Sequence, residues 1–174
     1  MNCRRRFFST IRIYTDGSCL HAGLCGGLHS GIHSGLRGGI GIYFPNGEHP
    51  NISMAYPQSF ELPPTSQRCE LLAVSYAIVI HHVWLNSKPC TIYTDSENTI
   101  DSLTHYCNLW SKNGWKKTNG DPVKNTDLLI PLHTLFTKSP NVEVQFVKAH
   151  TGLLDEHSLN NNIADAFAKK GLYR

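Results

Sequence analysis

Two short segments of alternating β-branched and aromatic residues each end on an aspartate within nearly the same motif. Residues 10–15 precede Asp16-Gly17-Ser18, and residues 91–94 precede Asp95-Ser96. The alternation predicts a strand in each case, and the Asp-Gly-Ser sequence predicts a turn where the first strand stops. Ligand sites of open α/β sheets gather at strand ends, so neighbouring strands would place Asp16 beside Asp95.

The remaining segments predict a mixed sheet with helices packed on it. Residues 41–44 and 51–56 predict a hairpin, and apolar residues at three- and four-residue intervals predict a helix over 66–85. Further elements are predicted as helices at 98–106, 126–136 and 160–170 and a strand at 142–147. Pro131 is expected to bend its helix or to mark the first turn. The order indicates the α/β class, with five strands in all.

Glycine is concentrated in one segment of this chain. Eight of the 14 glycines are Gly23, Gly26, Gly27, Gly31, Gly35, Gly38, Gly39 and Gly41. Glycine at every fourth position suits neither helix nor strand, so residues 20–38 are predicted to be an insertion within one domain over 10–174. Four possible zinc ligands, Cys19, Cys25, His29 and His33, match no common structural spacing, and the segment lacks the Gly-Lys-Ser/Thr ending of a phosphate loop.

Length and composition exclude several classes of protein. A chain of 174 residues with 40% apolar residues is large enough to bury a hydrophobic core without disulfide bonds or structural metals. The apolar stretch 71–83 is interrupted and predicted to be too short to cross a membrane. The basic arm at 1–9 lacks the apolar region of a secretory signal, so we expect an intracellular protein of cytoplasm or nucleus with reduced cysteines. Mitochondrial targeting by this arm stays open as an alternative.

Paired carboxylates at two strand ends point to a metal. Neighbouring carboxylates raise one another's pKa unless a cation lies between them, and hard oxygen ligands favour Mg²⁺ or Mn²⁺. Either aspartate motif alone is also typical of a simple turn. Three further residues change the interpretation: Glu70 within 68–73, His150 within 147–152, and Asp165 within 161–165.

These acids, the histidine and their flanking motifs occur in an order that resembles the type 1 ribonuclease H family. The resemblance covers the chain except for the basic arm and the Gly-rich segment. It implies a ribonuclease H-like fold, in which three antiparallel strands precede the parallel ones and helices cover both faces of the sheet. It also implies an endonuclease that hydrolyses the RNA strand of RNA/DNA hybrids and leaves 5′-phosphate and 3′-hydroxyl ends.

The resemblance also implies roles for individual residues. Two Mg²⁺ ions, which Mn²⁺ can replace, would be held by Asp16, Glu70, Asp95 and Asp165. His150 would assist proton transfer or product release. Substrate contacts would come from Ser66, Gln67, Trp115, Lys116, Lys117 and Asn161. The partner would be a hybrid duplex, bound by a monomer and recognised by shape and the 2′-hydroxyl.

Two positions differ from the commoner family pattern. Ser66 stands where an Asn is more usual, and its hydroxyl has a shorter reach. Glu97 stands where bacterial members often have Gln, and it would repel a phosphate unless it points away or meets an ion. For the segment 110–124, which resembles a basic protrusion, the alternative is a solvated charged face around a core Trp.

Two other functions stay open at this level. One is an inactive hybrid-binding module of the same fold, against which the presence of all four acids argues. The other is a structure-specific DNA nuclease of the same fold, against which His150 and the basic protrusion argue.

Overall fold

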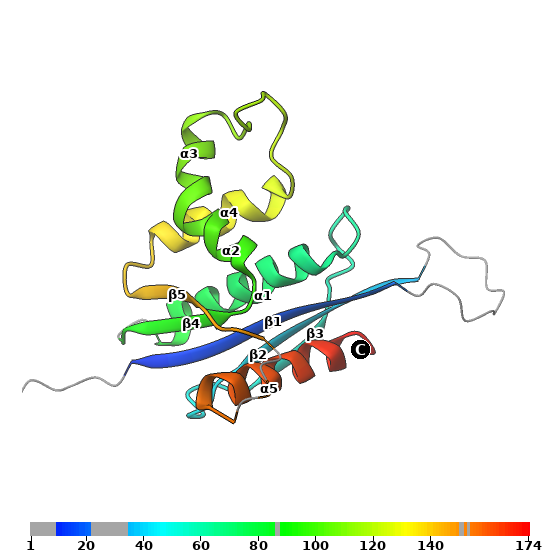
Figure 1. Cartoon of the computed structure of the whole chain (residues 1–174), viewed down its shortest axis with the longest axis vertical. Coiled ribbons are helices and arrows are strands. Elements are labelled where there is room, and N and C mark those ends of the chain that lie inside the picture. The colour runs from blue at the N-terminus through cyan, green and yellow to red at the C-terminus, as the bar shows by residue number, and fades with distance from the viewer. Residues whose placement is uncertain (1–9, 22–34, 86–87, 150–151, 153) are drawn as a thin grey trace, which may run out of the picture.

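A computed structural model of the chain describes residues 10–21, 35–85, 88–149, 152 and 154–174. In this part of the chain, five strands form one sheet in the order β3-β2-β1-β4-β5 (Figure 1). The strands are β1 (Ile11–His21), β2 (Leu36–Tyr43), β3 (Ile52–Ala55), β4 (Cys90–Thr94) and β5 (Val142–Phe146). β1, β2 and β3 pair antiparallel, whereas β4 pairs parallel to β1 and β5 parallel to β4. The predicted mixed sheet is confirmed.

Helices cover both faces of this sheet (Figure 1). Successive strand residues face opposite sides: a Cβ on Gly38 would contact Cys69 of α1, whereas one on Gly39 would contact Ala168 of α5. The helical elements are α1 (Ser66–Ile80), η1 (His81–Leu85), α2 (Glu97–Asp101), η2 (Ser102–Tyr106), α3 (Cys107–Lys112), α4 (Thr126–Thr137) and α5 (Glu156–Gly171).

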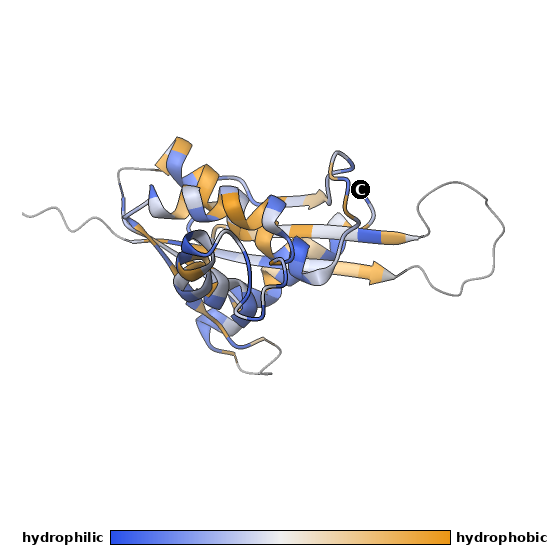
Figure 2. Cartoon of the chain, turned by 90° about the horizontal axis from the view of Figure 1, so that it is seen from above, coloured by the Kyte–Doolittle hydropathy of each residue, from blue (hydrophilic) through white to orange (hydrophobic). Residues whose placement is uncertain are grey.

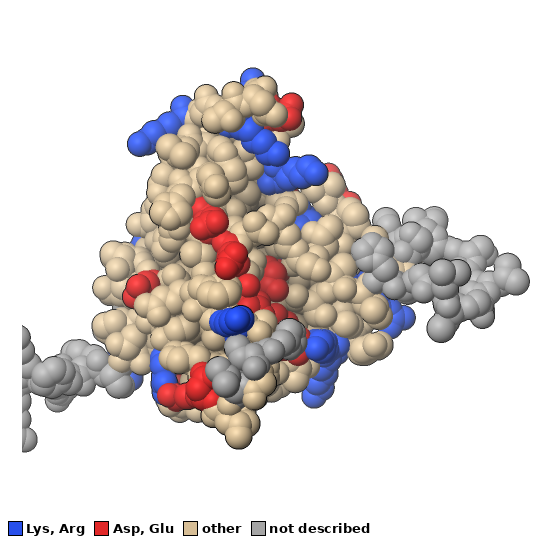
Figure 3. All heavy atoms as spheres, viewed as in Figure 1, with Lys and Arg blue, Asp and Glu red and all other residues tan. Residues whose placement is uncertain are grey.

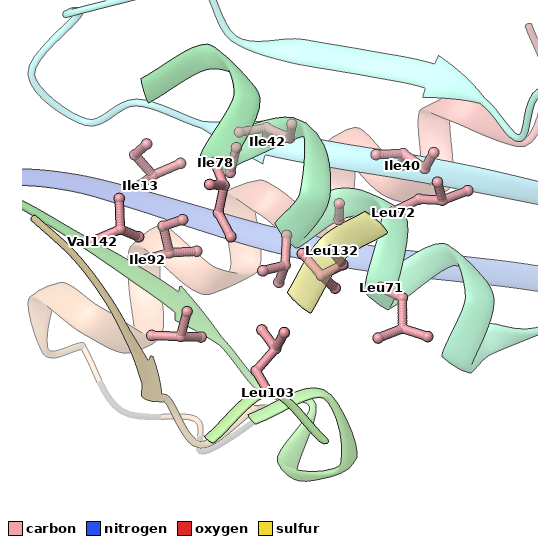
Figure 4. Packing of buried hydrophobic residues seen from close by; sticks show 14 of the residues in the cluster. Ile13, Ile40, Ile42, Leu71, Leu72, Ile78, Ile92, Leu103, Leu132 and Val142 are labelled. Atoms are coloured by element: carbon pink, nitrogen blue, oxygen red, sulfur yellow. The ribbon is translucent and has the colours of Figure 1, made fainter. Parts of the chain in front are cut away.

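The hydrophobic core lies mainly between the sheet and α1. Figure 4 shows Ile13, Ile42 and Ile92 of the strands near Ile78 of α1, with Leu103 of η2 and Leu132 of α4 in the same cluster. Figure 2 shows apolar residues gathered along α1 and the strands. Each such side chain contributes roughly 1.5–3 kcal/mol when fully buried. The core therefore fixes α1, and with it Glu70, against β1.

The continuous helical stretch Ser66–Leu85 matches the predicted bounds. By length and composition this whole stretch is long and apolar enough to cross a membrane, whereas the expectation concerned the shorter apolar run 71–83 within it. However, 56% of its apolar window is buried inside the fold, as is usual for the core helix of a globular domain.

The first strand is longer than predicted. β1 continues through Asp16-Gly17-Ser18 to His21, paired in register with β2 from Tyr14↔Tyr43 to His21↔Leu36. The predicted turn at this motif is wrong, because the ladder to β2 overrides the local preference of the sequence for a turn. Residues 20–21 and 36–38, which we expected in the Gly-rich insertion, belong to these two strands.

The paired end of this hairpin leads to a testable prediction. His21 and Leu36 are register partners, and a two-residue Asn-Gly turn is the favoured link between such strands. We expect a chain in which Asn-Gly replaces residues 22–35 to fold with a melting temperature within about 5 °C of the unaltered chain. Circular dichroism during heating measures this. A chain with Asn-Gly in place of residues 20–37 is the control, and it should melt lower because it loses four strand residues. Equal melting of the two variants would contradict the prediction.

Two predicted helices differ in detail from the structure. The last helix begins at Glu156 rather than at residue 160, because Asp155 caps it by accepting a hydrogen bond from the Ser158 amide at 3.1 Å. Pro131 lies inside α4 instead of in its first turn.

The N-terminus of α1 is tied to α4 by a buried arginine. Arg68 is only 2% exposed, and its guanidinium makes a bidentate ion pair with Asp127 at 2.9 and 2.6 Å. Its Nε donates to the hydroxyl of Tyr56 at 2.8 Å. A buried charge is tolerated only with such partners. This network therefore fixes the first turn of α1, where Ser66 and Gln67 lie, relative to α4.

Candidate active site

Three acidic side chains from three different elements converge where β4 ends. Thr15 of β1 pairs with Thr94 of β4, so the next residues, Asp16 and Asp95, come side by side. Glu70 of α1 joins them, and one carboxylate oxygen from each acid lies within 4.8 Å of the others. Figure 3 shows acidic side chains gathered over the middle of this face. The convergence predicted for Asp16 and Asp95 is confirmed.

Glu70 reaches the other acids because Gly17 has no side chain. A Cβ on Gly17 would lie 2.2 Å from the backbone nitrogen of Glu70 and 2.4 Å from the carbonyl carbon of Cys69. Only glycine lets the backbone of α1 come this close to β1. The local pattern predicts a turn at Gly17 and gives no indication of this role. A glycine directly after a predicted ligand was a signal that could also have indicated close packing.

A second glycine brings α5 and Asp165 to the site. Gly41 is the register partner of Asp16, and a Cβ there would lie 2.1 Å from the carbonyl oxygen of Ala164. Because cross-strand partners face the same side of a sheet, this approach puts Asp165, the residue after Ala164, on the side of Asp16. The charge of Asp165 contributes to raising the pKa of Asp16.

Burial and mutual repulsion disfavour the ionised forms of the acids at this site. Burial, followed by the charges of Asp95 and Asp165, raises the pKa of Asp16 from 3.8 to about 7. Burial, followed by Asp16 and Asp95, raises the pKa of Glu70 well above its usual value. The Glu70 Oε2 atom is buried and accepts no hydrogen bond from any described residue. A buried carboxylate oxygen without a hydrogen-bond partner, among carboxyl groups whose pKa values are raised, fits a hard divalent cation that takes oxygen ligands.

The helix α5 contributes two further polar contacts at the site. Asn161 is 2% exposed, and its Nδ2 donates to Oδ2 of Asp95 at 3.2 Å. Asp165 lies outside the tight group of three acids and pairs instead with Lys169, with Nζ to Oδ2 at 2.7 Å. The structure thus brings all four predicted acids to one region, three of them in direct proximity.

A sequence model of the RNase H family matches residues 9–173. The chain belongs to the RNase H family. It is 35% identical over 163 residues to the ribonuclease H of Actinobacillus pleuropneumoniae, covering 92% of this chain and 89% of that protein. It is 31% identical over 159 residues to ribonuclease H1 of Homo sapiens, of which it spans 49%. It is also 35% identical over 138 residues to the probable ribonuclease H of Acanthamoeba polyphaga mimivirus, of which it spans 58%.

Solved structures show the same fold. The solution structure of the PFV RNase H domain superposes with a TM-score of 0.70 at 21% identity, covering 94% of each chain. This likeness supports the RNase H architecture of the five-stranded sheet and its helices.

The residues predicted to bind substrate in this RNase H family member fall into two kinds. Ser66 and Gln67 are exposed in the first turn of α1, and Lys116 and Lys117 are exposed beyond α3. Trp115 is half-buried and packs against the core, with its ring nearly perpendicular to that of His133, whereas Asn161 contacts Asp95 from inside the fold. His150 lies outside the described residues.

Glu97, which departs from the commoner family residue, begins α2. It is exposed, in the first turn of that helix, where the partial positive charge of the helix N-terminus favours a carboxylate. A structural reason for an acid at this position is therefore present.

Proposed function

We propose that this chain is an endonuclease that hydrolyses the RNA strand of RNA/DNA hybrids with the help of divalent metal ions. The observation that carries the proposal is the convergence of Asp16, Glu70 and Asp95, with ligand oxygens within 4.8 Å. The chain also belongs to a family whose relatives are named ribonuclease H. A structure-specific DNA nuclease or a hybrid-binding module would need different substrate or metal behaviour, which the experiment below separates.

Asp16, Glu70, Asp95 and Asp165 would hold two Mg²⁺ ions, which Mn²⁺ can replace. When bound, such ions make water a better nucleophile toward phosphorus and stabilise the departing oxygen. The residues of the chain orient this chemistry. The backbone of Gly17 favours the ionised forms of both Asp16 and Glu70 by lowering their pKa values, and the Asn161 amide donates a hydrogen bond to one oxygen of Asp95. Products with 5′-phosphate and 3′-hydroxyl ends are part of this proposal.

The substrate would lie across the acidic cluster between two exposed groups. Ser66 and Gln67 offer a hydroxyl and an amide, which suit the 2′-hydroxyls and base edges of the hybrid minor groove. Lys116 and Lys117 offer charges for the phosphates of the DNA strand, on a segment that Trp115 anchors to the core. His150, assigned by family resemblance, would assist proton transfer or product release in a monomeric enzyme.

Cleavage of end-labelled duplexes by the purified chain tests the proposal. We expect it to cut the RNA strand of a hybrid in Mg²⁺ or Mn²⁺, to leave double-stranded DNA intact, and to lose all cleavage in EDTA. Added salt should weaken hybrid binding, because the release of counterions from the phosphates favours binding less as the salt concentration rises. Cutting of duplex DNA but not of hybrid would support the DNA nuclease instead. Hybrid binding without cleavage in either metal would support the inactive module.

A further inference from the structure

Three polar residues lie on successive turns of α5 and share one face of that helix. Asn161, Asp165 and Lys169 are spaced four residues apart, and residues at this spacing stack above one another on a helix. Asn161 donates to Asp95, and Lys169 donates to Asp165. This face of α5 therefore presents an amide, a carboxylate and an ammonium group along the acidic site.

The charge of Lys169 acts on the cluster as well as on Asp165. Lys169 lowers the pKa of Asp16, opposing the effects of burial and of Asp95 and Asp165. In return, the hydrogen bond to Asp165 raises the pKa of Lys169, and the charge of Asp16 adds to this effect. The ammonium group thus supplies part of the positive charge that the buried acids require.

We propose that Lys169 is an internal counter-ion: it neutralises Asp165 in the metal-free protein and competes with divalent cations for that carboxylate. The inference rests on the proposed function, because the cation in question is the one that would serve hybrid cleavage. Beyond that function, the proposal gives Lys169, which is not one of the four acids, a part in determining metal affinity. A cation that approaches Asp165 must displace the ammonium group or share the carboxylate with it, and either event weakens binding.

The neighbouring lysine offers a matched control. Lys170 is exposed and lines a shallow apolar groove on the outer side of α5 together with Leu159, Ile163 and Phe167. Lys169→Met and Lys170→Met each remove one exposed charge from the same helix turn. Any general effect of net charge or helix propensity is therefore common to both variants, whereas loss of the contact with Asp165 is confined to the first.

Isothermal titration of Mn²⁺ into the nucleic-acid-free protein measures the competition without any cleavage step. We expect Lys169→Met to bind Mn²⁺ about two- to fivefold more tightly than the unaltered chain, the range set by a partly exposed ion pair. Lys170→Met should bind as the unaltered chain does, and Lys169→Arg, which keeps the charge, should show no such gain. Equal affinity of the two Met variants would overturn the proposal, as would weaker binding by Lys169→Met.

Thermal melting supplies a second readout. In EDTA, Lys169→Met should melt below Lys170→Met, because the carboxylates lose a counter-ion, and saturating Mg²⁺ should raise its melting temperature by more. Equal Mg²⁺-induced shifts would contradict the counter-ion role. Hybrid cleavage by the unaltered chain is assayed separately. Its absence would count against the proposed function, whereas unchanged Mn²⁺ affinity of Lys169→Met in an active chain would count against the counter-ion alone.

Discussion

Asp16→Asn is expected to reduce metal-dependent hybrid cleavage by about 10³-fold or more while the chain remains folded. A metal ion supplies several kcal/mol of transition-state stabilisation, and each 1.36 kcal/mol corresponds to a factor of ten in rate. Asp16 is the acid that faces Asp95, Glu70 and Asp165 together, so its carboxylate is the hardest to replace. Single-turnover cleavage of a labelled hybrid in Mg²⁺ measures the loss.

Asp101→Asn, on the exposed side of α2, is the matched control and should cleave as the unaltered chain does. Equal cleavage by Asp16→Asn and the unaltered chain would refute the assignment of the site. Binding of the hybrid in Ca²⁺ separates lost chemistry from lost affinity, because the exposed groups at Ser66, Gln67 and Lys116 are unaffected by the substitution.

The same variant should be more stable than the unaltered chain when no metal is present. The pKa of Asp16 rises from 3.8 to about 7 on folding, so the folded state holds a proton that the unfolded state releases between these values. Its contribution to stability is complete below about pH 4 and is lost as the pH rises through about 7. An Asn carries no such charge. In EDTA at pH 8 we expect Asp16→Asn to gain about 2–4 kcal/mol in unfolding free energy.

Urea denaturation at pH 8 and at pH 4.5 measures this difference, with Asp101→Asn again as control. The gain should shrink toward pH 4, where Asp16 is protonated in the folded chain. Saturating Mg²⁺ at pH 8 should remove or reverse it, because the cation offsets the carboxylate charges of the unaltered site. A gain that is the same at both pH values would mean that the charge of Asp16 is not what destabilises the metal-free chain.

The sequence permitted prediction of those parts of the site that follow from strand order. Asp16 and Asp95 each follow the same local pattern of alternating residues, and parallel pairing of neighbouring strands brings such positions together. The bounds of the core helix at Ser66 and Leu85 were also predictable, since its apolar residues recur with helical period. Local pattern and global structure agree at these positions.

Other parts depend on contacts between residues far apart in the chain, which local patterns do not specify. β1 passes through Asp16-Gly17 because it pairs with β2 across the Gly-rich segment, although the dipeptide alone favours a turn. The buried position of Asn161 and its bond to Asp95 depend on how closely α5 approaches the sheet at Gly41. Tertiary packing therefore decides whether Asp16-Gly17 forms a strand or a turn, and whether Asn161 is buried or exposed.

The close approach of α1 to β1 gives the second large effect. Gly17 lies within β1 and its φ is not positive, so its requirement for glycine is one of space. In Gly17→Ala, the added methyl group would meet backbone atoms of Cys69 and Glu70, which cannot rotate away. We expect a loss of about 3 kcal/mol in unfolding free energy from this overpacking.

Cleavage should fall further than stability alone explains. Relief of the clash moves Glu70 away from Asp16, and a displacement of about 1 Å at a catalytic group costs about 10²-fold in rate. Assays at 10 °C below the melting temperature of each variant separate the two effects.

Ser18→Ala is the control, because residue 18 follows on the same strand with its side chain on the opposite face, and it should cleave normally. If Gly17→Ala melted lower but kept the full cleavage rate, the position of Glu70 would not depend on Gly17. A joint loss of rate and of Mn²⁺ affinity would instead show that the absence of a side chain at Gly17 keeps Glu70 close enough to Asp16 to share a metal ion.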